Sequence, residues 1–183
     1  KASPAYLPWD VYMGKPLQKL FYKVIIYDFM NRRAEICVKA MNEEVLALVK
    51  KERPRYVIWT SFYYDIQEST LDLIRSEGTT VVGWFFDDEW RFDDYSKWWV
   101  PYLDYVVTNA YESLPRYKAL GIPAIHTVPN TGVIVDKPQL SEKYDVSFVG
   151  SVTFADRMHH INRLKNEKIA VNVFGEGSTG YIP

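Results

Sequence analysis

Short runs of apolar, β-branched and aromatic residues alternate with longer amphipathic stretches along most of the chain. Runs of this length predict buried strands. They occupy residues 21–28, 55–60, 79–86, 104–109 and 122–128. Helices are predicted between them, at residues 31–53, 68–76 and 113–120, the first capped by Asn31 and ended by Pro54. Strands this apolar, separated by helices, are typical of a parallel sheet covered on both faces.

The rhythm breaks over residues 129–143, which are rich in proline and polar residues, and then restarts. A strand at 144–150, a helix at 156–167 and a strand at 168–174 follow. We therefore expect an α/β protein with a doubly wound, mostly parallel sheet over residues 1–137. Residues 138–183 would be the first β-α-β unit of a second domain. Such a unit cannot bury both faces of its sheet, so either it packs on the first domain or its remainder is missing.

Composition narrows the classes of function. The 183 residues are 48% hydrophobic and 25% charged, which fits a protein with a buried core, and the net charge is -1. We do not expect nucleic acid as a partner, because proteins that bind it normally carry a cluster of excess positive charge. One cysteine excludes an internal disulfide, and no apolar run approaches the length of a transmembrane helix. These features predict a cytoplasmic protein.

Polar residues follow the predicted strands, at the edge where ligands bind in doubly wound sheets. The densest group is the acidic run Asp87, Asp88 and Glu89. Adjacent carboxylates repel one another, which raises the pKa of at least one and suits a general base or a cation site; they also suit a solvated loop. The other candidates for a ligand cleft here are Asp28, Trp90, Thr108, Asn109 and Asn130.

A second set of candidates lies near the carboxyl end of the chain. Gly150 and Ser151 end a strand, and Arg157 lies in the helix that follows, an arrangement that can bind phosphate oxygens at a helix N-terminus. Gly175 and Gly177 form a second glycine-containing strand end. The dinucleotide and P-loop fingerprints are absent from the sequence. The three histidines do not suggest a metal site, and no metal or cofactor is expected.

These segments together resemble the spore-maturation-type glycosyltransferases, over residues 28–177. The similar motifs are WFFDDEWRF at 84–92, DYVVTN at 104–109, YKALGIP at 117–123, YDVSFVGS at 144–151 with Arg157, and VFGEG at 173–177. That resemblance implies the GT-B class, with two Rossmann-like domains. It implies an acceptor held by the first domain and a nucleotide-sugar donor held by the second. Most donor-binding residues of that family lie beyond the first β-α-β unit, so we expect this chain to be a fragment.

The resemblance also implies a metal-independent reaction, in which a carboxylate of the first domain deprotonates an acceptor hydroxyl. Asp87 or Asp88 is the candidate base. Gly150, Ser151, Arg157, Gly175 and Gly177 are the candidates for donor phosphate binding. The donor sugar, the acceptor and the stereochemistry stay open, and so does the activity of this chain by itself.

Two alternatives remain. A non-catalytic module of the same fold would bind sugar or protein without turnover. A receiver-like phosphorylation domain would need acids after the first strand, a phospho-acceptor after the third and a lysine after the fifth. Such a domain also has a threonine or serine after the fourth strand, so Asp28, Asp87 and Thr108 fit three of these positions. However, only one acid follows the first strand, and the fifth ends in Val128-Pro129-Asn130 with no lysine.

Overall fold

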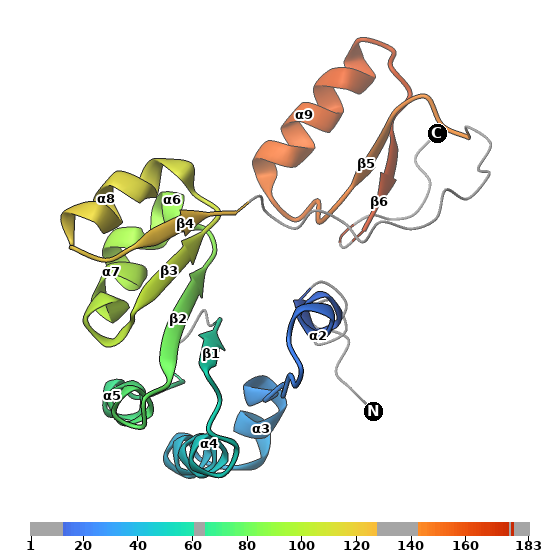
Figure 1. The fold of residues 1–183 in the computed structure, drawn as a ribbon. Helices are drawn as coiled ribbons and strands as arrows, with labels where there is room; N and C mark the ends of the chain where they lie inside the picture. Colours follow the sequence, from blue (N-terminus) through green and yellow to red (C-terminus); the bar gives the residue numbers. More distant parts are fainter. Residues whose placement is uncertain (1–12, 61–64, 128–142, 176, 178–183) are drawn as a thin grey trace. The chain divides into compact units, whose positions relative to one another are not determined.

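The computed structural model describes residues 13–60, 65–127, 143–175 and 177. It is an α/β structure, as the alternation predicts, with two separate parallel sheets (Figure 1). The first sheet has the order β1-β2-β3-β4 and the second pairs β5 with β6. The strands are β1 (Tyr56–Trp59), β2 (Thr80–Phe85), β3 (Tyr105–Thr108), β4 (Ala124–His126), β5 (Ser147–Val149) and β6 (Asn172–Phe174).

The chain divides into two compact units, Lys1–Val133 and Ile134–Pro183, and each contains one of the sheets. Among the described residues, β5 and β6 pair only with each other, and no ladder joins the two sheets. The helices of the first unit are α2 (Lys15–Leu20), α3 (Phe29–Glu35), α4 (Val38–Glu52), α5 (Glu68–Ser76), α6 (Asp88–Arg91), α7 (Lys97–Trp99) and α8 (Leu114–Ala119). Short turns of other helix types connect them: η2 (Phe92–Ser96), η3 (Val100–Tyr102) and η4 (Tyr111–Ser113).

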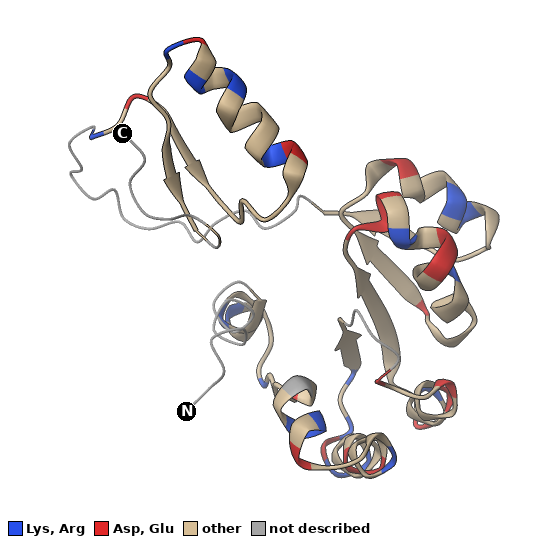
Figure 2. Cartoon of the chain, turned by 180° about the vertical axis from the view of Figure 1, so that it is seen from behind, with Lys and Arg blue, Asp and Glu red and all other residues tan. Residues whose placement is uncertain are grey.

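One face of the first sheet forms the core. Val81, Phe85 and Val106 alternate along β2 and β3 toward this face, and side chains from the helices cover them. The helix residues in this core include Val49 of α4, Leu71 and Ile74 of α5, Trp99 of α7 and Tyr117 of α8. The strands themselves carry almost no charge, and the charged residues gather on helices and loops (Figure 2).

The opposite face differs from the sequence-based expectation that both faces are covered. Tyr56, Tyr105 and Ile125 project to that side and are 38%, 45% and 60% exposed. Every crossover from β1 to β4 moves one position along the sheet, so the connecting helices of a right-handed series lie on one side. The described helices of this unit therefore leave the second face largely open.

The predicted strand at residues 21–28 is wrong. Residues 23–28 have no regular secondary structure, although the sequence is rich in β-branched and aromatic residues. The segment runs beside α4: Lys23 pairs with Glu52, and the hydroxyl of Tyr27 donates to Glu44 at 2.9 Å. β-propensity mainly measures how well a side chain packs on a pleated sheet. Because this segment has no neighbouring strand, its β-forming residues are not enough to make it a strand.

The predicted helix over residues 31–53 is two helices. Ile36 and Cys37 are extended, which separates α3 from α4. Asn31 is not the N-cap, because α3 begins at Phe29 and Asn31 lies inside the helix. Asp28 caps α3 by accepting a hydrogen bond from the backbone N–H of Asn31 at 3.1 Å.

The second unit is a β5-α9-β6 motif, with α9 at Ala155–Asn166. Val152, Ile161, Val171 and Val173 are its buried apolar side chains. The strands of this motif pair in parallel, with Phe148 opposite Val173. Its carboxyl edge, where Val149 and Phe174 end their strands, is the edge that the sequence marks as a phosphate site.

Candidate functional site

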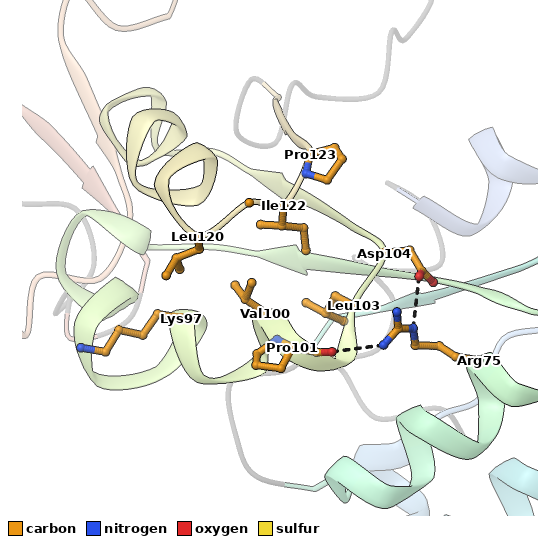
Figure 3. A pocket seen from close by; sticks show the side chains of 10 residues that line it. Arg75, Lys97, Val100, Pro101, Leu103, Asp104, Leu120, Ile122 and Pro123 are labelled. Carbon is orange, nitrogen blue, oxygen red and sulfur yellow. Dashed lines mark hydrogen bonds and ion pairs between the residues drawn. The ribbon is translucent and has the colours of Figure 1, made fainter.

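A hollow of about 420 Å³ lies at the amino end of the first sheet, away from the predicted site (Figure 3). The Arg75 guanidinium lines one side of it, pairing with Asp104 at 3.1 Å and donating to the carbonyl of Pro101 at 3.1 Å. The other carboxylate oxygen of Asp104 accepts the backbone N–H of Val81 at 2.8 Å. Arg75 and Asp104 are thus bonded to protein groups. We therefore assign these polar residues a structural role and not a role in ligand binding.

The carboxyl end of the sheet carries a buried carboxylate. Asp88, the first residue of α6, has 0% of its surface exposed. Three hydroxyl groups donate to its carboxylate: Ser96 to Oδ1, and Thr108 and Tyr117 to Oδ2, each of the last two at 2.6 Å. Hydrogen bonds to an ionised acceptor are among the stronger ones. Asp88 therefore ties α6, η2, β3 and α8 together.

The electrostatics of Tyr117 fit this arrangement. Burial raises the pKa of its phenol, and the negative charge of Asp88 raises it further. The hydroxyl thus stays protonated and keeps donating to the carboxylate. Thr108 is equally occupied, because its Oγ1 also accepts the N–H of Ala110 at 3.2 Å.

Asp88 and Thr108 were expected to face a ligand, and the structure places both in the interior. Their polar atoms hydrogen-bond to the protein, and neither residue is exposed. A direct contact with substrate is not available to either residue in this structure.

Asp87 is different. It is half-buried, and no described residue hydrogen-bonds to its carboxylate. Its backbone has φ 62° and ψ 31°, the left-handed region that non-glycine residues rarely adopt. The side chain of Asn109 fixes this turn by accepting the N–H of Asp87 at 3.1 Å. The structure thus brings Asp87 and Asn109 together at the carboxyl edge, with the Asp87 carboxylate available.

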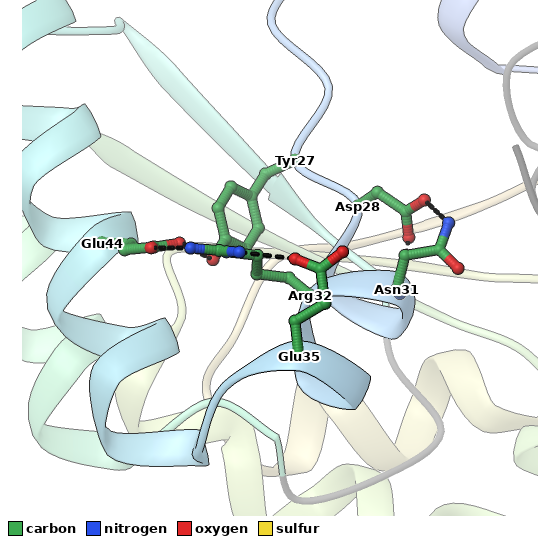
Figure 4. A network of polar contacts seen from close by, with 6 residues as sticks. All are labelled: Tyr27, Asp28, Asn31, Arg32, Glu35 and Glu44. Carbon is green, nitrogen blue, oxygen red and sulfur yellow. Dashed lines mark hydrogen bonds and ion pairs between the residues drawn. The ribbon is translucent and has the colours of Figure 1, made fainter. Parts of the chain in front are cut away.

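The remaining predicted residues of this cleft have separate positions. Asp28 caps α3 and accepts hydrogen bonds from both the backbone and the side chain of Asn31, so its carboxylate is occupied (Figure 4). Glu89 and Trp90 are exposed on α6, and the Arg91 guanidinium lies 5.6 Å from the centre of the Trp90 ring. Asn130 lies outside the described residues.

Two residues at this edge were missed by the sequence analysis. Tyr111 is 70% exposed, and its ring meets that of His126 at 5.6 Å and nearly at right angles. His126 ends β4 beside Thr108 in the sheet register. Their positions in the sequence could have identified them. His126 lies in the fifth predicted strand, and Tyr111 follows Asn109 by two residues.

The second unit brings Gly150, Ser151 and Arg157 together. The Arg157 guanidinium folds back over the turn and donates to the carbonyl of Ser151 at 2.9 Å. It also lies 4.7 Å from the centre of the Phe154 ring. The hydroxyls of Ser151 and Thr153 are 2.7 Å apart. A guanidinium and two hydroxyls thus face the same turn before α9.

Gly175 and Gly177 border the same turn. The N–H of Gly150 donates to the carbonyl of Phe174 at 2.8 Å. A Cβ on Gly175 would lie 2.5 Å from the carbonyl oxygen of Gly150, closer than such atoms approach. The protein backbone alone therefore requires glycine at 175. Gly177, at φ 77°, would place a Cβ 3.1 Å from a methyl group of Thr153.

Within the described part of the chain, no group of three or more His, Cys, Asp or Glu side chains is arranged to hold a metal ion. None of the helices described here combines the length and apolarity needed to cross a bilayer.

Comparison with known proteins finds little. No family model matches the chain, and no curated protein matches it. Among solved structures, it is similar to a chain in the "Glycosylation Associate Protein (Gap123) complex from Streptococcus agalactiae", with a TM-score of 0.47 and 15% identity. The similarity covers 75% of this chain and 29% of that one, so this chain spans under a third of its neighbour's length. No function is transferred at this level of similarity.

Proposed function

We propose that the chain belongs to a glycosyltransferase of the GT-B class, which moves a sugar from a nucleotide-sugar donor to an acceptor hydroxyl. In this proposal, the second unit binds the donor diphosphate and the carboxyl edge of the first sheet receives the acceptor. The motif resemblance described above supports it. So does the presence of two separate α/β units, each with polar residues at the carboxyl edge of a parallel sheet.

The position of Arg157 is the observation that carries the donor proposal. Its NH1 bonds to the carbonyl of Ser151, and its other N–H groups remain for an anion. The hydroxyls of Ser151 and Thr153 lie beside it, and the N-terminus of the twelve-residue helix α9 adds a favourable dipole. A diphosphate is the ligand whose charge and acceptor oxygens match this set.

Asp87 is the proposed general base. Of the two carboxylates considered, it is the one without a described hydrogen-bond partner, whereas Asp88 accepts three. The left-handed turn, in which the N–H of Asp87 donates to the side chain of Asn109, fixes Asp87 at the carboxyl edge. Asp87 would accept the proton of the acceptor hydroxyl as that oxygen attacks the anomeric carbon and the nucleoside diphosphate leaves. Asp87→Asn should lower sugar transfer by a factor of 100 or more and leave nucleotide binding unchanged.

Calorimetric titration with a nucleoside diphosphate tests the donor proposal. Arg157→Ala should weaken binding at least tenfold, because it removes the charge-assisted hydrogen bonds. Arg163→Ala is the matched control, since Arg163 lies exposed in the last turn of the same helix and should not change the affinity. Equal affinities of the wild-type protein and Arg157→Ala, or no binding of diphosphate at all, would contradict the proposal.

A non-catalytic binding module is the second candidate. The observation that favours it is the burial of Asp88, which leaves the acidic run with fewer accessible carboxylates than its sequence suggests. Binding of a donor with no sugar transfer to any acceptor would support this alternative over the enzyme.

A further inference from the structure

Two large aromatic side chains stand out from the carboxyl edge of the first sheet. Trp90 is 69% exposed on α6, and Tyr111 is 70% exposed on η4. The helices that carry them pack against each other, and the hydroxyl of Ser113 donates to the backbone carbonyl of Asp88 at 3.4 Å. Both rings therefore sit on elements that meet at the same buried residue, Asp88.

The Tyr111 ring also contacts a residue of the sheet. It contacts the ring of His126, which is itself exposed at the end of β4. Rings that are rigidly held and largely exposed lose little conformational entropy on binding, and their flat apolar faces suit the C–H surfaces of a pyranose ring.

The polar groups around the rings are mainly hydrogen-bond acceptors. Asp87, Glu89 and Glu112 lie on the same two elements or immediately before them, and no described residue hydrogen-bonds to their carboxylates. The guanidinium groups nearby already contact other side chains of the protein. Arg91 lies 4.3 Å from the centre of the Tyr95 ring and 5.6 Å from that of the Trp90 ring, and Arg116 pairs with Asp93 and lies over Phe92.

From these contacts we infer that the acceptor recognised at this edge is an uncharged or amino sugar, stacked on Trp90 and Tyr111. This inference rests on the proposed function, since it names the substrate class of the acceptor site. Hydroxyl and ammonium groups of such a sugar can donate to the three carboxylates. The carboxylate of an acidic sugar would be repelled by the same groups.

Ligand-observed NMR titration with methyl glycosides tests it, using glucose, glucosamine and glucuronic acid as the matched series and galactose, galactosamine and galacturonic acid as the second. In at least one series the neutral or amino glycoside should bind, and the acidic one should bind at least fivefold more weakly. Trp90→Ala and Tyr111→Ala should each weaken binding of the favoured glycoside fivefold or more. Trp98→Ala is the control, because Trp98 is 62% exposed on α7 and lies outside the proposed contacts.

A charge variant sharpens the test. Glu112→Gln should narrow the difference between the neutral and the acidic glycoside. Equal binding of acidic and neutral glycosides, no binding of any glycoside, or unchanged binding by both ring variants would overturn the inference. Titrating the same samples with a nucleoside diphosphate separates the two proposals: diphosphate binding without glycoside binding refutes only the acceptor assignment. Glycoside binding without diphosphate binding refutes only the donor proposal.

Discussion

At the scale of single residues, the sequence identified the acidic run but could not tell Asp87 from Asp88. In β2, Val81 and Phe85 alternate toward the core, so a continued strand would direct residue 87 inward and residue 88 outward. The left-handed conformation of Asp87 reverses this, and Asp88 enters the interior instead. Aspartate tolerates that conformation, but the spacing of apolar and polar residues does not predict it.

Asp88→Asn should lower the free energy of unfolding by about 2–3 kcal/mol, because an amide cannot accept from all three hydroxyls and leaves a buried donor poorly paired. Chemical denaturation measures this. Glu89→Gln, one residue along and exposed, is the control and should change stability by less than about 0.5 kcal/mol. If both variants unfold at the same denaturant concentration, the three hydroxyl groups around Asp88 do not contribute to stability.

At the scale of elements, most strands and helices follow from the hydrophobic pattern. Helix α5 spans Glu68–Ser76, as predicted, and β1 to β6 lie within the predicted runs. The failure at residues 21–28 arises because strand formation needs a neighbour, which a local pattern does not supply. Polar contacts decided that segment: Tyr27, Arg32 and Glu44 join it to α3 and α4.

This junction should make stability depend on pH at the acid end. The hydrogen bond from Arg32 is the main cause that lowers the pKa of Glu44 from 4.5 to about 2. Burial opposes it, and the hydrogen bond from Tyr27 and the charge of Arg32 add smaller lowering effects. A lowered folded-state pKa means that the contribution to stability is present above pH 4.5 and is lost as the pH falls toward 2. Glu44→Gln should therefore be less stable than the wild type at pH 7, with the difference shrinking toward pH 2. Unfolding curves across that range measure it, and a pH-independent difference would contradict the assignment.

The β5-β6 edge supplies a second test at this scale. Gly175→Ala should disrupt the second unit, because its Cβ would collide with the backbone of Gly150. Gly78→Ala is the matched control: Gly78 also has a positive φ, 81°, but nothing lies within 4 Å of a Cβ there, so only about 1 kcal/mol of backbone strain is expected. Amide hydrogen exchange should speed up in β5 and β6 for Gly175→Ala and leave β1 to β4 unchanged. Unchanged protection of β5 and β6 would show that the backbone there can adjust.

At the scale of the whole molecule, the α/β class and the parallel pairing could be predicted, because strand runs and intervening helices leave few topologies. The sequence did not indicate that the described helices leave Tyr56, Tyr105 and Ile125 uncovered. Apolar strands look alike whether one or both faces are buried, so exposure of a face depends on which elements are present to pack on it.

The central proposal is that the turn between β5 and α9 binds an anion. Amide NMR titration of the 183-residue chain with a nucleoside diphosphate tests it directly. We predict chemical-shift changes concentrated at Gly150, Ser151, Thr153 and Gly175, which disappear in Arg157→Ala and persist in Arg163→Ala. Changes located elsewhere, or no changes at millimolar ligand, would contradict it.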